Sequence, residues 1–165
     1  MCEQATTLDD GRRITAVSRD PVDQPDASRI GVADYRWTDA TRSTGADAFT
    51  AELWLRHIWE DAPKAVRVFL RCGWRFGLGL RLGPADRSHV LGWRIDGTSD
   101  AAVTVSAKSR ILSAQNTITV SDDLICWQTV VHYERLIGRL LWLPASLLHQ
   151  LIVPWSVRRA VRSRA

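Results

Sequence analysis

The C-terminal segment, residues 134–155, constrains the fold more than any other part of this 165-residue chain. It is apolar enough to be a candidate membrane span. However, in an α-helix, which turns by about 100° per residue, its apolar residues lie on one side. One stripe consists of Leu136, Leu140, Leu143, Leu147 and Leu151. The adjoining stripe consists of Ile137, Leu141, Leu148, Ile152 and Trp155. The opposite side carries Arg135, Arg139, Ser146 and Gln150.

This one-sidedness argues against a membrane span, because a helix that crosses lipid is apolar all round. Arg139 near the centre of a bilayer would cost at least about 2.5 kcal/mol. We therefore expect no integral span, but a long amphipathic helix whose leucine-rich half lies against a β-sheet of the same chain. Pro144 removes a backbone donor and predicts a bend that would let the helix follow a curved surface.

Between residues 88 and 133 the hydrophobic period changes to two, which is typical of β-strands. The alternation is present in residues 89–96, 101–108, 111–120 and 124–133. The connections between these runs are rich in Asp, Ser and Gly, which favour turns. Strands so close together in the sequence predict an antiparallel meander.

The first half of the chain predicts a short strand near residues 34–37, followed by two helices. Apolar residues at helical spacing follow Asp47. A second helix is expected after Pro63, because proline is favoured in the first helical turn. Residues 1–30 are polar, contain two prolines and predict a flexible N-terminal arm. Residues 31–165 then form a single α+β domain.

Composition narrows the classes of function. Eight Trp residues suit a thick core, the wall of an apolar pocket or an interface. Part of the formal charge of +4 is concentrated in a C-terminal cluster, Arg158, Arg159, Arg162 and Arg164. We interpret this cluster as a solvated helix end rather than a nucleic-acid site, and contact with anionic lipid stays open.

The sequence contains no recognisable catalytic or metal motif, and no cofactor is predicted. No P-loop, nucleophile elbow or His-Glu-x-x-His pattern occurs, and the four histidines lie far apart. Residues 1–26 lack the pattern of a signal peptide. The three cysteines are too scattered for a disulfide framework or a zinc site, and predict reduced, mostly buried thiols in a cytoplasmic protein: Cys2, Cys72 and Cys126.

Seven residues are candidates for a ligand pocket. The residues expected to line its apolar part are four tryptophans: Trp54, Trp93, Trp127 and Trp142. Arg139 and His149 lie in the terminal helix, where a polar group at the margin of a cavity could orient a ligand's carboxylate or carbonyl. Alternatively, Arg139 pairs with an acidic neighbour and His149 with a backbone group. His132 joins Arg139 and His149 as the candidates for catalysis if the scaffold is an enzyme.

Five segments carry a resemblance to a known family: residues 33–35, 76–78, 129–132, 138–139 and 149–154. They are similar to the uncharacterised bacterial DUF2867 proteins. The order of elements resembles the START/Bet v 1-like superfamily, also called the SRPBCC or polyketide cyclase-like group. The chain departs from the family pattern soon after Arg139, where an aromatic residue is expected and Leu140 and Leu141 precede Trp142. It also departs at Gln150, where a basic residue is expected.

The resemblance spans residues 33–163 and implies a helix-grip fold, in which a curved antiparallel sheet wraps around the long C-terminal helix. It also implies an internal cavity, but no established reaction. A function inferred from the fold alone is an analogy.

Three hypotheses of function follow. The first is noncatalytic binding or carriage of a hydrophobic small molecule (a lipid, a polyketide or an aromatic compound) in the cavity. The second is a cyclase-, dehydratase- or hydrolase-like enzyme that uses the same cavity. The third is a membrane-surface or protein-interaction module, because a one-sided helix with an arginine-rich end is also typical of interfacial helices. No nucleic-acid partner is predicted, whereas peripheral membrane contact stays open.

Overall fold

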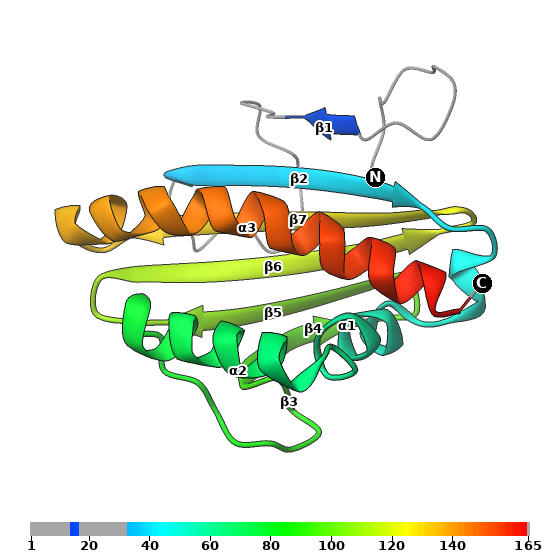
Figure 1. The fold of residues 1–165 in the computed structure, drawn as a ribbon, viewed down its shortest axis with the longest axis horizontal. Helices are drawn as coiled ribbons and strands as arrows, with labels where there is room; N and C mark the ends of the chain where they lie inside the picture. The colour runs from blue at the N-terminus through cyan, green and yellow to red at the C-terminus, as the bar shows by residue number, and fades with distance from the viewer. Residues whose placement is uncertain (1–13, 17–32, 165) are drawn as a thin grey trace.

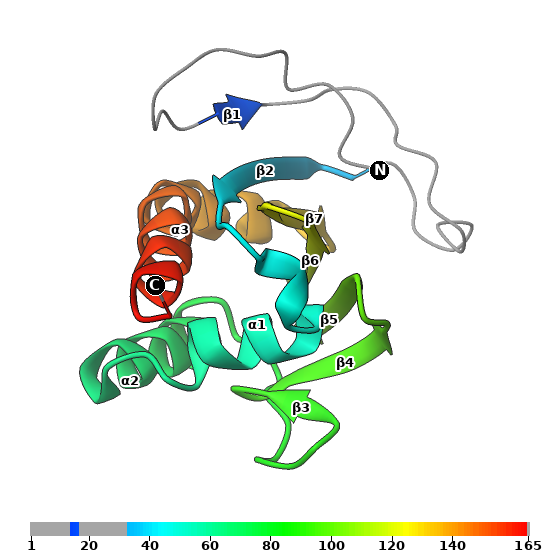
Figure 2. The ribbon, with the colours of Figure 1, turned by 90° about the vertical axis from the view of Figure 1, so that its right-hand side faces the viewer.

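The computed structural model describes residues 14–16 and 33–164, and shows a curved antiparallel sheet with the α-helices on one side of it (Figures 1 and 2). The strands are β1 (Ile14–Ala16), β2 (Tyr35–Arg42), β3 (His89–Val90), β4 (Trp93–Thr98), β5 (Ala102–Lys108), β6 (Leu112–Ser121) and β7 (Leu124–Tyr133). The helices are η2 (Ala46–Ala48), α1 (Ala51–Trp59), α2 (Lys64–Cys72), η3 (Gly73–Gly77) and α3 (Leu136–Arg162). The predicted α+β fold is confirmed.

The spatial order of the strands is β1-β2-β7-β6-β5-β4-β3. The run from β4 to β7 is the predicted meander, in which each strand pairs with the next. The exception to sequential order is β2, which pairs with β7 after the chain has passed through α1, α2 and the meander. This pairing closes the helix-grip arrangement, since it places the first and last long strands under the C-terminal helix (Figure 1).

Alternation decides which side chains of the sheet face the helices. In β5 and β6 every second residue is buried, as the period of two predicts. The predicted run 89–96 is divided into β3 and β4, because Leu91 and Gly92 form a tight turn with φ of 50° and 93°. Such a two-residue turn matches the twist of paired strands and reverses the chain.

The two short helices begin where local signals place them. Asp47 lies in the 3₁₀ turn η2, and α1 begins later than expected, after Thr50, whose hydroxyl accepts a hydrogen bond from the Leu53 N–H at 3.3 Å. Helix α2 begins directly after Pro63, as predicted. Five residues of α1 are buried, whereas α2 has no buried residue.

Helix α3 packs against the sheet, but the prediction that its leucine-rich half faces the strands is wrong. The first stripe points outward: Leu136 is 84% exposed, and Leu140, Leu147 and Leu151 are each 67% exposed. The buried residues of α3 lie on the other side and are small, polar or aromatic in several cases: Gly138, Trp142, Ser146, Val153, Pro154, Ser156, Val157 and Ala160.

The start of α3 explains this orientation. The backbone N–H groups of Glu134 and Arg135 donate to the carbonyl oxygen of Ile111, at 2.9 and 3.2 Å. A Cβ on Gly138 would lie 2.2 Å from the same oxygen, so only glycine fits there and this side of the helix faces the sheet. One turn later, Trp142 packs edge-on against Tyr35 of β2, with ring centroids 5.4 Å apart. The first leucine stripe lies roughly opposite and stays in solvent.

By length and composition α3 could cross a membrane, and 22% of its most apolar 18-residue window is buried in the fold. The predicted arm, residues 1–30, lies outside the described residues except for β1, which pairs with β2 at the edge of the sheet. Cys72 is free but exposed, whereas Cys126 on β7 is buried but disulfide-bonded. The expectation of reduced, mostly buried thiols is therefore wrong about the burial of Cys72 and about the redox state of Cys126.

Candidate functional site

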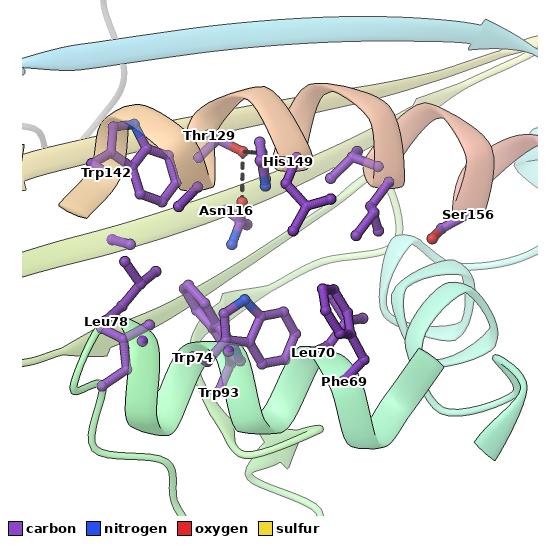
Figure 3. Close-up of a pocket in the computed structure, with 18 of the residues that line it drawn as sticks. Phe69, Leu70, Trp74, Leu78, Trp93, Asn116, Thr129, Trp142, His149 and Ser156 are labelled. Atoms are coloured by element: carbon purple, nitrogen blue, oxygen red, sulfur yellow. Dashed lines mark hydrogen bonds between the residues drawn. The ribbon is translucent and has the colours of Figure 1, made fainter. Parts of the chain in front are cut away.

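A pocket of about 370 Å³ lies between α2–η3 and α3, above the helix-facing side of the sheet (Figure 3). One wall comes from Phe69, Leu70, Gly73, Trp74 and Gly77. The opposite wall comes from α3 and contains Leu141, Trp142, Pro144, Ala145, Leu148, His149, Ile152, Val153 and Ser156. The remaining lining residues form the floor: Ile58, Trp59, Leu78, Leu80, Trp93, Ala114, Asn116, Trp127 and Thr129.

Four indole rings form an aromatic cluster at this floor. The ring of Trp59 is central, with centroids 5.1 Å from Trp74, 5.7 Å from Trp93 and 5.5 Å from Trp127. Trp74 and Trp93 meet edge to face at 5.3 Å. Aromatic rings at these distances and tilts attract each other beyond the burial of their surface. The pocket therefore has a preformed apolar surface.

The pocket also has one polar corner, where β6, β7 and α3 meet (Figure 3). The Trp127 N–H donates to Asn116 Oδ1 at 3.2 Å, which identifies that atom as the carbonyl oxygen. The hydroxyl of Thr129 donates to the same oxygen at 2.7 Å. Because its single proton is used there, Thr129 Oγ1 acts as the acceptor toward His149 Nε2 at 2.8 Å. His149 thus carries its proton on Nε2.

His149 is uncharged at neutral pH. Its surface is partly accessible where it borders the pocket, but the packed protein around the ring removes most of its water. This desolvation lowers the pKa of the imidazole from 6.5 to about 4. The rings of Trp37 and Trp142 lie beside it, with centroids at 5.2 and 5.8 Å. The corner therefore offers hydrogen bonds without a charge.

One strong donor in this corner is left for a ligand. The side-chain amide nitrogen of Asn116 points into the pocket (Figure 3), and it forms no hydrogen bond to another residue of the described part of the chain. The indole nitrogens of Trp93 and Trp142, both lining residues, are buried and likewise lack a partner among the described residues. Buried donors without partners are uncommon in folded proteins, so the site has unused capacity for an acceptor group.

Four of the seven predicted site residues line this pocket: Trp93, Trp127, Trp142 and His149. The other three lie elsewhere. Trp54 is buried in the core under α1, where its N–H donates to the Ala46 carbonyl at 2.8 Å. His132 is three residues after Thr129 on β7 and so faces the opposite side of the sheet. Arg139 is exposed on α3, one residue after the side that is fixed by Gly138.

Several lining residues were not anticipated. Trp59 and Trp74 complete the aromatic cluster, and Asn116 and Thr129 build the polar corner. A signal for the last two was present, because each occupies a buried position in an otherwise apolar alternating strand. They are also direct partners in the β6–β7 register. No pattern in the sequence predicts which residues of β6 and β7 pair with each other.

The chemistry available in the pocket is limited. His149 is the only ionisable side chain among its described lining residues. Across the described part of the chain, no group of three or more His, Cys, Asp or Glu side chains could hold a metal ion. The arrangement is suited to enclosing an apolar molecule and hydrogen-bonding one end of it.

Comparison with known proteins identifies no relative of this chain. No protein-family model, no curated protein and no solved structure matches the chain.

Proposed function

We propose that this protein binds or carries an apolar small molecule in the pocket between α2–η3 and α3, without transforming it. The observation that carries the proposal is a preformed apolar pocket of about 370 Å³ that contains a single polar corner. Pockets for small molecules are typically on the order of 300–1,000 Å³, mostly apolar, with a few polar groups that fix orientation. A lipid, a polyketide or an aromatic compound fits this description.

The polar corner favours a neutral acceptor in the ligand, such as a hydroxyl or carbonyl oxygen. The Asn116 amide is positioned to donate to it. A carboxylate is disfavoured, because no Lys or Arg is among the lining residues and His149 is neutral. An unpaired charge in such surroundings carries a large desolvation cost.

The enzyme alternative has less support from the geometry. Of its three candidate groups, only His149 borders the pocket, whereas His132 and Arg139 lie on other surfaces. A base with a pKa of about 4 is weak, and catalytic acid–base groups work best with a pKa near the operating pH. Binding without chemistry therefore fits the lining better.

The first test uses the neutral dye N-phenylnaphthylamine, followed by dye displacement and thermal shift. We expect the dye to fluoresce in the pocket and to be displaced by decanol. Decanoate, which has the same chain with a charged end, should bind at least about tenfold more weakly at neutral pH.

Two variants show whether the pocket is the site. Ala114→Phe fills the floor and should abolish dye binding, whereas Ala101→Phe, in the exposed turn before β5, should not. Asn116→Leu should weaken decanol about tenfold and leave the dye unaffected, since the dye has no strong acceptor. Dye binding that survives Ala114→Phe would contradict the proposal.

A further inference from the structure

Both helical walls of the pocket carry further apolar side chains that the fold leaves in solvent, and of these Phe69 also lines the pocket. On α2–η3 these are Val68, Phe69 and Phe76, and on α3 they are Leu136, Leu140, Leu143, Leu147, Leu151 and Trp155. We call these nine residues the docking face. Figures 1 and 2 show that α2 and α3 lie on the same side of the sheet. Phe76 is 78% exposed, and extended apolar patches of this kind mark interaction sites.

The charged residues within the two segments that carry the docking face have one sign. Residues 62–85 and 135–164 contain half of the chain's 22 Lys and Arg residues and none of its 18 Asp and Glu residues. The basic residues are Lys64, Arg67, Arg71, Arg75, Arg81, Arg135, Arg139, Arg158, Arg159, Arg162 and Arg164. The ion pairs found among the described residues involve none of them. The surface is therefore both apolar and cationic.

Near the C-terminal end of α3 the arginines surround a hollow. It has a volume of about 370 Å³ and is lined by Gln150, Leu151, Pro154, Trp155, Arg158, Arg159 and Arg162. Arg158 and Arg162 are exposed at this hollow. Exposed guanidinium groups are suited to the oxygens of a phosphate group. Leu151 and Trp155 belong to both the hollow and the docking face.

We propose that α2–η3 and α3 dock on a lipid bilayer that contains anionic phospholipids. The leucine stripe enters the boundary between head groups and acyl chains, Trp155 lies at the head-group level, and the arginines of the hollow bind lipid phosphates. That the pocket mouth then opens toward the bilayer, so that the ligand passes between pocket and lipid, rests on the function proposed above.

The charge pattern favours a membrane over a second copy of this chain. Two such faces in contact would bring arginines against arginines, which is unfavourable. The packing of α3 also favours docking over spanning. Trp142 and His149 of this helix are joined to β2 and β7 through ring contacts and hydrogen bonds. A spanning helix would have to give up these contacts.

The test measures flotation of the full chain with vesicles of phosphatidylcholine alone, or of an equimolar mixture with phosphatidylglycerol. We expect binding to the mixed vesicles that is at least about tenfold stronger than to phosphatidylcholine and that weakens with salt. No binding to the mixed vesicles would overturn the proposal. A solution dimer that conceals the leucine stripe would also overturn it.

Matched variants test the apolar and the cationic contributions separately. Leu147→Ser should weaken binding about tenfold, whereas Leu53→Ser, at an exposed leucine of α1, should change it less than about twofold. The double variant Arg158→Gln/Arg162→Gln should weaken binding to the mixed vesicles about tenfold or more. Its control is Arg42→Gln/Arg94→Gln, at two strand residues that face away from the helices. Equal losses of vesicle binding in the test and control variants would contradict the assignment of these residues as the docking face.

Vesicle binding and dye binding distinguish this inference from the proposed function. Leu147 does not line the pocket, so Leu147→Ser should retain dye binding. Ala114→Phe, which fills the pocket, should still bind mixed vesicles. If Ala114→Phe bound vesicles while the unaltered chain bound no dye, docking would stand and the proposed function would fail. If the unaltered chain bound the dye but no vesicles, the proposed function would stand and docking would fail.

Discussion

Helices α1 and α2 are each nine residues long, adjacent in sequence and on the same side of the sheet, yet they relate to it differently (Figure 2). Helix α1 buries five residues against the strands, and Leu55 and Ile58 are almost completely enclosed. Helix α2 buries none, and Phe69 is 50% exposed. One helix completes the core, and the other covers a pocket.

The difference shows how this fold makes a cavity. Under α1 the space is filled, and the indole N–H of Trp54 has found a carbonyl. Beyond α2 the chain enters the π-helical turn η3, where Gly73 and Gly77 contribute no side chain to the space in front of the floor. Irregular helical turns of this kind are frequent at functional sites. The pocket is therefore a region in which the second helix stands away from the sheet.

The largest expected effect comes from truncating one leucine in each helix. Leu55→Ala, at a residue that is 1% exposed, removes core contacts and should lower the free energy of unfolding by about 2–5 kcal/mol. Leu70→Ala, in α2, enlarges an existing pocket and should lower it by less than about 1 kcal/mol. Chemical denaturation of both variants gives the comparison. Similar losses would mean that α2 is packed as firmly as α1.

The second test asks whether the space under α2 is dry, through the titration of His149. Because its pKa is about 4 in the folded protein and 6.5 ordinarily, the unfolded chain binds this proton first as the pH falls. The folded state is therefore most stable, as far as His149 is concerned, above pH 6.5, and loses up to about 3 kcal/mol as the pH falls to 4.

His149→Gln lacks this titration, so the difference between the two unfolding profiles isolates it from the carboxylates. The free-energy difference between the unaltered chain and the variant should change between pH 6.5 and 4. A constant difference would show that water fills the pocket and leaves the imidazole with its ordinary pKa.

The smallest expected effect concerns local opening rather than global stability. With no buried residue to hold it, α2 should open more easily than α1, and its backbone amides should exchange with deuterium faster. Exchange measured by mass spectrometry on peptides from 51–59 and 64–72 makes the comparison directly. Decanol at saturation should slow exchange in α2 and leave α1 unchanged. Equal protection of the two helices without ligand would contradict the contrast.

Much of the fold could be predicted because its signals are local. The alternation in residues 101–133 predicted β5, β6 and β7, and Pro63 predicted the start of α2. Trp93 and Trp127 were named as wall residues, although the pattern did not say which sheet face points inward. Trp54 was named for the same reason and lies in the core instead, because an indole on a helix suits either place.

The orientation of α3 could not be predicted from local sequence signals. The spacing of apolar residues in 134–155 predicts a long amphipathic helix with two adjoining apolar stripes, since spacing alone specifies which residues share a side. The observed helix is Leu136–Arg162. Which of its sides meets the sheet depends on tertiary contacts. The orientation depends on the carbonyl of Ile111, which admits Gly138 and no larger residue. Likewise, the partnership of Asn116 with Thr129 depends on a strand register that is set by non-local pairing.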